Sequence, residues 1–152
     1  MNTQPLWLFL HLAGVVVWVG GMFFAYVCLR PVAAETLDPP LRLTLWVKVF
    51  ERFFRFVWAA VALILVSGFI MLATQGFAVA PPHLHLMFGL GLLMLAVFVG
   101  VVTVPYTALR EAVAASNWPA GAAALGRIRK LVGFNLSLGF VVIAIATLGR
   151  WI

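Results

Sequence analysis

Residues 6–29 read LWLFLHLAGVVVWVGGMFFAYVCL, an apolar run of 24 residues that contains one histidine, His11. At 1.5 Å per residue, a helix of this length spans about 36 Å, enough to cross the hydrocarbon core of a bilayer with some tilt. An ionisable side chain inside such a span is costly unless it has a partner, so His11 marks a candidate functional site. The residues that meet His11 therefore decide what the protein does.

The composition indicates an integral membrane protein embedded in a lipid bilayer. The 152-residue chain is 65% hydrophobic and 9% charged, whereas a soluble domain carries about 25% charged residues. The net charge of +6 does not indicate nucleic-acid binding, because the basic residues flank apolar segments as topology signals do. The N-terminal stretch lacks the basic region of a cleavable signal peptide and its apolar run is too long for one, so we expect it to remain as a span.

Four apolar segments predict an all-α, integral membrane four-helix bundle that forms a single domain over residues 1–152. The spans are expected at residues 6–29, 57–74, 83–109 and 131–149. The first helix is expected to end at Pro31, and the next long helix to begin at Arg42; Pro105 is expected to kink the third span. The single cysteine, Cys28, is interpreted as a small buried hydrophobe, and Ser67-Gly68 as a point of close helix contact.

The distribution of basic residues predicts the topology. Nine of the ten lysine and arginine residues lie in the connections between spans one and two or three and four, and only Arg150 lies on the other side. The positive-inside rule then makes both connections cytoplasmic and both termini periplasmic, in a multi-pass protein of the bacterial inner membrane. A basic stripe of Lys48, Arg52 and Arg55 precedes the second span. We interpret it as an interfacial anchor, with binding of an anionic ligand as the alternative.

All three histidines fall in the outer half of the membrane under this topology. His11 shares a helical face with Gly14 and Trp18, and His85 shares one with Gly89. Small residues on these faces let a flat cofactor approach the backbone. Imidazoles from two helices can bind both axial positions of a haem iron. The first hypothesis is therefore a b-type haem protein with bis-histidine ligation by His11 and His85, and with Gly14, Trp18 and Gly89 beside the cofactor.

The opposite face of the third span supports a different chemistry. His83 lies about 200° around the helix from His85, on a face with Met87 and Met94. Imidazole and thioether ligands suit the soft Cu(I) ion, so His83, Met87 and Met94 form an alternative copper site, with Met71 as a further thioether. The simplest alternative is that these histidines only make interhelical hydrogen bonds and the methionines only pack, in a structural or assembly partner.

Two stretches of the sequence resemble a known family. Residues 10–24 (LHLAGVVVWVGGMFF) and 55–72 (RFVWAAVALILVSGFIML) are similar to spans of the bacterial copper resistance D (CopD) family. The four-span layout also resembles J-type protoporphyrinogen oxidase, a small haem-binding family with a histidine in span one and a His-x-Lys-Leu motif opening span three. Here that motif reads His83-Leu84-His85-Leu86, so His85 replaces the family's lysine. The resemblance implies His11 as one haem ligand and places His85 at the second position.

These hypotheses predict different functions and partners. A haem protein is expected to act in electron transfer or porphyrin redox chemistry, as a membrane oxidoreductase with a membrane or periplasmic redox partner. The resemblance to the copper resistance family implies copper uptake instead. Hydrolytic catalysis is not expected, because the four acidic residues lie in loops or at cytoplasmic ends. Small helix faces on spans two and four leave room for a homo-oligomer.

Overall fold

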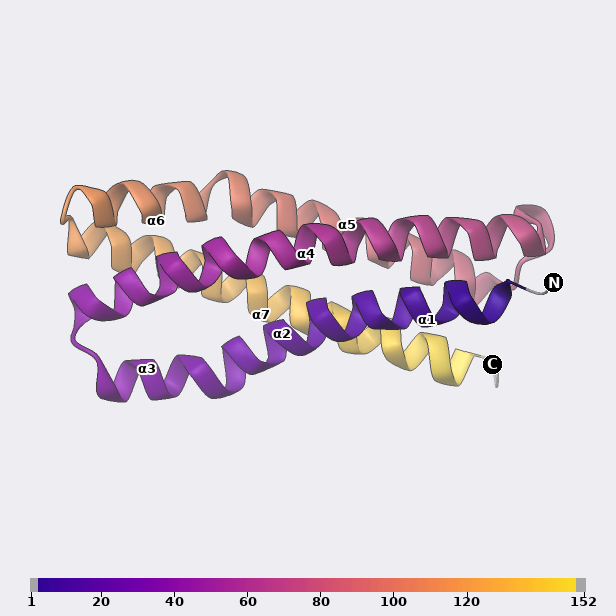
Figure 1. Cartoon of the computed structure of the whole chain (residues 1–152), viewed down its shortest axis with the longest axis horizontal. Helices are drawn as coiled ribbons and strands as arrows, with labels where there is room; N and C mark the ends of the chain where they lie inside the picture. Colours follow the sequence, from indigo (N-terminus) through magenta and orange to yellow (C-terminus); the bar gives the residue numbers. More distant parts are fainter. Residues whose placement is uncertain (1–2, 150–152) are drawn as a thin grey trace.

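The computed structural model describes residues 3–149, and within them four long helices run antiparallel along one axis (Figure 1). Each is long and apolar enough to cross a membrane, which confirms the predicted all-α, four-span architecture. The beginning of α1 and the end of α7 lie at the same end of the bundle. Arg150, the predicted exception to the charge pattern, lies outside the described residues.

The first long helix contains two wide π-turns. It comprises α1 (Gln4–Val15), η1 (Val16–Gly20), α2 (Gly21–Phe23), η2 (Phe24–Leu29) and α3 (Arg30–Thr36). The second long helix is α4 (Pro39–Gln75), followed by the 3-10 turn η3 (Phe77–Val79). The third is divided into α5 (Pro82–Thr103) and α6 (Pro105–Ala114), and the fourth is α7 (Trp118–Leu148).

Local sequence explains where the helices begin and end. Prolines stand in the first turn of α4, α5 and α7, where the missing N–H group costs no hydrogen bond. Asn117 caps α7, because its side-chain oxygen accepts a hydrogen bond from the Ala120 N–H at 3.2 Å. Helix α4 ends at Gln75, and the next residue, Gly76, has a φ of +87° that is readily adopted only by glycine.

The expected helix end at Pro31 is wrong. The first long helix continues to Thr36, and only Leu37 and Asp38 separate it from α4. The π-turn η2 ends at Leu29, so Pro31 falls in the first turn of α3, where its missing N–H group is tolerated. The next helix begins at Pro39, before the expected Arg42.

The predicted kink at Pro105 is confirmed. Helix α5 ends at Thr103, and Val104 departs from helical geometry with φ −111° and ψ −76°. Helix α6 then begins at Pro105, so that proline occupies its first turn.

The expected burial of Cys28 is wrong, because its side chain is exposed on the first long helix. In a span, the outer surface contacts lipid tails, which are as apolar as the interior. A thiol behaves as a small hydrophobe, so facing lipid costs it little.

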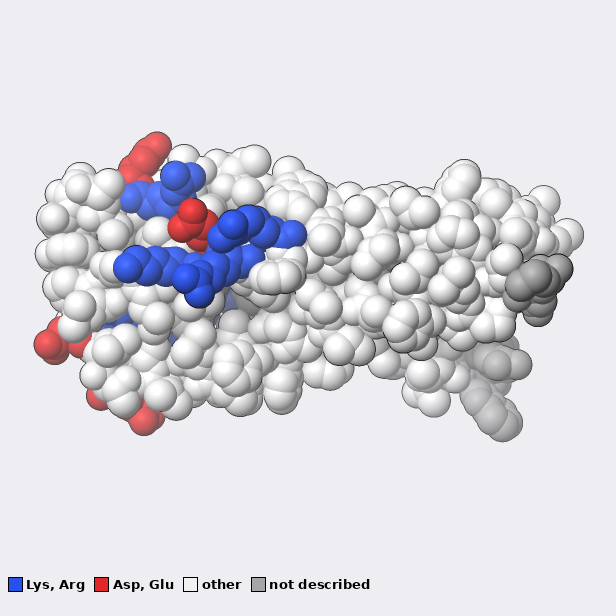
Figure 2. Space-filling model, in the orientation of Figure 1, with Lys and Arg blue, Asp and Glu red and all other residues white. Residues whose placement is uncertain are grey.

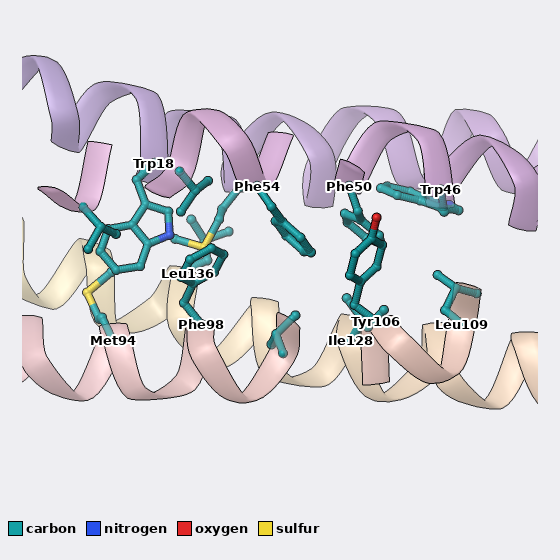
Figure 3. Close-up of a cluster of buried hydrophobic side chains, with 14 of the residues drawn as sticks. Trp18, Trp46, Phe50, Phe54, Met94, Phe98, Tyr106, Leu109, Ile128 and Leu136 are labelled. Carbon is teal, nitrogen blue, oxygen red and sulfur yellow. The ribbon is translucent and has the colours of Figure 1, made fainter. Parts of the chain in front are cut away.

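An aromatic column fills the middle of the bundle (Figure 3). Phe50 stacks on Phe54 with ring centroids 5.3 Å apart, and Tyr106 meets Phe54 edge-on at 5.0 Å. Towards the other end, the rings of Trp18 and Phe98 meet edge-on at 6.0 Å. Such pairs stabilise a fold by about 0.5–1.5 kcal/mol each beyond their buried area. Around this column, α1 packs along α4, while α5 and α6 pack along α7.

Among residues 3–149, the charged side chains are confined to one half of the molecule. On the face drawn in Figure 2, the lysine, arginine and acidic side chains gather at the end formed by α3, the start of α4, α6 and the start of α7. Helices of 31–37 residues are about 46–56 Å long, whereas the hydrocarbon core is about 30 Å thick. The uncharged part of α4, residues 56–75, alone spans about 30 Å. The bilayer core therefore matches the uncharged half, and the basic half extends into the interface.

Candidate functional site

A cavity of about 600 Å³ lies in the uncharged half of the bundle, between α1, α4, α5 and the end of α7. Four of its lining residues carry groups that can bind a soft metal ion: His11, Met71, His83 and Met87. Most of the other lining side chains are apolar. We call this space the histidine cavity.

Hydrogen bonds to α4 fix the imidazole of His11. Its Nδ1 lies 3.1 Å from the Ile64 carbonyl oxygen and 3.1 Å from Ser67 Oγ. The Ser67 hydroxyl donates its own hydrogen to the Leu63 carbonyl, so both neighbours of Nδ1 act as acceptors and Nδ1 carries the ring hydrogen. Nε2 of the neutral ring keeps its lone pair and has no hydrogen-bond partner within residues 3–149. A metal-binding histidine is typically held in this way, by an acceptor on its other nitrogen.

Two glycines bring α1 and α4 close enough for these hydrogen bonds. A Cβ atom at position 68 would lie 3.2 Å from His11 Cε1, so the imidazole rests directly on Gly68. A Cβ atom at Gly14 would lie 2.7 Å from Ile64 Cγ1. The sequence predicted a close helix contact at Ser67-Gly68, and the group that packs there is the His11 ring. Gly14, expected beside a cofactor, packs in the interface between the two helices.

Helix α5 contributes the second imidazole. His83 and Met87 are one helical turn apart and both line the histidine cavity. His83 packs against the end of α7, since a Cβ atom at Gly149 would lie 2.9 Å from His83 Cβ. Met71 reaches the same cavity from α4. The structure thus brings His11 and His83 to one cavity, together with two thioethers.

Trp18 and Met94 are neighbours in the hydrophobic core (Figure 3), but only Trp18 also lines the histidine cavity. Trp18 is 4% exposed and lines the cavity, as expected for a residue beside a ligand. Met94 is equally buried, but it packs in the hydrophobic core and does not line the cavity. Of the predicted copper ligands, His83 and Met87 share the cavity and Met94 does not.

His85 and Gly89 lie outside the histidine cavity. The side chain of His85 is exposed, with Nε2 3.1 Å from the Phe77 carbonyl oxygen and Nδ1 3.4 Å from that of Pro81. Gly89 is also exposed, and nothing lies within 4 Å of a Cβ atom built on it. The structure therefore does not bring His11 and His85 together, and His85 instead ties the loop between α4 and α5 to the first turn of α5.

The small-residue face of α5 points outward, contrary to expectation. The exposed residues on this face are His85, Gly89, Leu92 and Ala96. Because lipid tails are as apolar as the protein interior, small side chains alone do not show which face of a span is inside. Sequence reasoning did not place His83 and His11 at one cavity, although the turn from His83 to Met87 was a signal that favoured this face of α5.

The available ligand types indicate which metal the cavity can hold. Within residues 3–149, no group of three or more histidine, cysteine, aspartate or glutamate residues is placed to bind a metal ion. A site in the histidine cavity therefore depends on thioethers beside imidazoles. That donor set is typical of Cu(I), whereas carboxylate and carbonyl ligands suit harder ions.

Comparison with family models finds a match to copper resistance protein D (CopD) over residues 47–148, about two thirds of the chain. The chain belongs to the CopD family. The match covers Met71, His83 and Met87, but it begins after α1, so His11 lies outside it. No curated protein and no solved structure matches the chain significantly. The CopD match and the four spans identify a multi-pass inner membrane protein of a copper resistance family.

Proposed function

We propose that this CopD protein binds Cu(I) in the histidine cavity and takes part in copper uptake across the membrane. The observation that carries the proposal is that two imidazoles and two thioethers from three helices line one cavity. Family membership supports copper as the metal.

The lining residues have distinct roles in this proposal. His11 offers Nε2 as a ligand, and the hydrogen bond from its Nδ1 to α4 orients the ring before copper arrives. His83 and Met87 supply a second imidazole and a thioether from adjacent turns of α5, and Met71 supplies a thioether from α4. The apolar walls limit access of water, which competes for the ion.

Metal content of purified variants tests the proposal. The full chain, purified in detergent and loaded with Cu(I) under reducing conditions, is expected to retain copper after desalting. His11→Ala, His83→Ala and Met87→Leu are expected to lower Cu(I) affinity at least about tenfold each, because each removes a ligand. His85→Ala is the matched control and is expected to bind as the wild type does, because His85 lies outside the cavity.

Two patterns of copper binding among these variants would contradict the proposal. Loss of copper in His85→Ala together with retention in His83→Ala would move copper binding to the His85 face of α5, which the sequence analysis assigned to haem, and would reject the histidine cavity. Full retention in all three ligand variants would remove the histidine cavity from copper binding. Copper accumulation in cells that express each variant then shows whether binding at the cavity is required for uptake.

A b-type haem is the second candidate, because His11 and His83 belong to different helices that line one cavity. In this case His83, and not His85, is the partner of His11, in a protein of electron transfer or porphyrin redox chemistry similar to J-type protoporphyrinogen oxidase. A Soret band with sharp reduced α and β bands, and stoichiometric iron without copper, would favour haem. Copper without iron favours the first proposal.

A further inference from the structure

A second cavity, of about 290 Å³, lies at the basic end of the bundle. Its walls come from the end of the first long helix, the start of α4 and the first half of α7. Three arginines line it: Arg30, Arg42 and Arg129. None of the described residues that line this space is acidic. We call it the arginine cavity.

Contacts within the protein hold two of the three guanidinium groups at this cavity. The Arg30 guanidinium lies over the ring of Tyr26, 4.7 Å from its centroid. Arg42 Nη1 donates a hydrogen bond to the Ala34 carbonyl oxygen at 3.4 Å. The contact with Tyr26 covers one face of the Arg30 guanidinium, and the hydrogen bond to Ala34 uses one N–H of Arg42. A guanidinium has five N–H donors, so most of them remain for a ligand.

The unbalanced charge favours an anion in the arginine cavity. Three positive groups around one small space repel one another, and a bound anion converts this repulsion into attraction. The planar guanidinium presents two parallel donors that match the oxygens of a phosphate group. Charge and geometry thus indicate a phosphate-bearing ligand.

The remaining walls favour an amphiphile over a free ion. Apolar side chains such as Leu43, Leu125 and Val132 line the same space as the arginines. The cavity also lies where the uncharged segment of the first long helix ends, at Arg30, which is the level of the lipid headgroups. Basic pockets between membrane helices at this level bind anionic headgroups in other membrane proteins.

We propose that the arginine cavity binds an anionic phospholipid. Its phosphate lies between Arg30, Arg42 and Arg129, and its acyl region covers the apolar wall. Free phosphate shares the charged chemistry but leaves this wall uncovered. The site is separate from the histidine cavity and does not depend on copper binding.

Native mass spectrometry of the full chain in detergent tests this proposal, with phosphatidylglycerol and phosphatidylcholine of equal acyl length. The wild type is expected to bind phosphatidylglycerol at least about tenfold more tightly than phosphatidylcholine. Combined Arg30→Gln, Arg42→Gln and Arg129→Gln substitutions are expected to abolish this preference. The charge-matched control combines substitutions outside the cavity, on exposed residues of α4: Lys48→Gln, Arg52→Gln and Arg55→Gln. It is expected to keep the wild-type preference.

Four outcomes would overturn the proposal. Equal loss in both triple variants shows general charge attraction, and equal binding of the two lipids shows that the arginines select nothing. Displacement of phosphatidylglycerol by inorganic phosphate at similar concentration shows a site for a small anion. If the triple variant does not fold, Arg30→Gln and Arg129→Gln are measured singly, and wild-type lipid preference in both rejects the site.

Discussion

At His11, the protein keeps a titratable ring inside a span by giving one of its nitrogens two acceptors. Both acceptors come from a single turn of α4, the Ile64 carbonyl and the Ser67 hydroxyl. The hydroxyl oxygen can accept because its hydrogen is already used by the helix backbone. With Nδ1 occupied in this way, Nε2 is the nitrogen that is left for a ligand.

Ser67→Ala is expected to weaken Cu(I) binding by about tenfold while leaving all four proposed ligands in place. The substitution removes one of two acceptors that orient His11, and loss of such a partner typically costs 10–100-fold in affinity. Competition titration with a chromophoric Cu(I) chelator measures the change. Ser137→Ala is the control, because that hydroxyl also bonds a carbonyl of its own helix, Gly133, but is exposed on α7. Equal affinity in the two variants would show that Ser67 does not orient the ligand.

Sequence alone predicted that His11 matters, because the cost of an imidazole in a 24-residue apolar run is independent of the fold. It did not predict that His83, and not His85, would share a cavity with His11. His83 and His85 are two positions apart and lie on nearly opposite sides of α5. Which of the two histidines faces the bundle interior therefore depends on which side of α5 is taken as the inner one. That choice depends on how α5 packs against α7, and a span has no polar outer face that would reveal it.

At the scale of the element, Gly14 allows α1 to lie against α4. Gly14→Ala is expected to lower the free energy of unfolding by about 1–3 kcal/mol, as overpacking does. The added methyl group would lie 2.7 Å from Ile64 Cγ1 and 2.9 Å from the Ala60 carbonyl oxygen, and the backbone oxygen cannot move aside alone. Gly20→Ala is the control in the same helix, because nothing lies within 4 Å of its new Cβ atom. Denaturant unfolding of both variants gives the comparison, and equal stability would contradict the close contact.

The loop between α4 and α5 depends on His85. His85→Ala is expected to speed amide hydrogen exchange in residues 76–80 severalfold, because it removes the side chain whose nitrogens meet the carbonyls of Phe77 and Pro81. Cu(I) affinity is expected to stay unchanged. His83→Ala should show the reverse pattern, with wild-type exchange in the loop and weaker copper binding. Exchange mass spectrometry of both variants separates the roles of two neighbouring histidines.

Helix number and the break at Pro105 followed from the sequence, since apolar length and the chemistry of proline determine them directly. The continuation of the first long helix through Pro31 did not follow from the sequence. There the helix changes from the π-turn η2 to α3, so that Pro31 stands in a first turn, and the sequence carried no signal for that change.

At the scale of the whole molecule, the two cavities lie in opposite halves, with the aromatic column between them. Trp18 borders the histidine cavity, whereas Trp46 and Phe50 border the arginine cavity. The uncharged half carries imidazoles and thioethers, and the charged half carries arginines. A metal ion and a lipid headgroup can therefore bind the same bundle without competing for residues.

This division assigns each cavity to one side of the membrane once the orientation is measured. The positive-inside rule predicts the basic end in the cytoplasm and the histidine cavity near the periplasm. In a Cys28→Ala background, Ala78→Cys in the loop between α4 and α5 is expected to react with an impermeant maleimide in intact spheroplasts. Ala115→Cys, at the other end of the bundle, is expected to react only after permeabilisation. Both positions are exposed, so a difference in labelling reports sidedness and not burial. The opposite labelling pattern would place the histidine cavity on the cytoplasmic side, and copper would then meet it on leaving the cytoplasm instead of on entering.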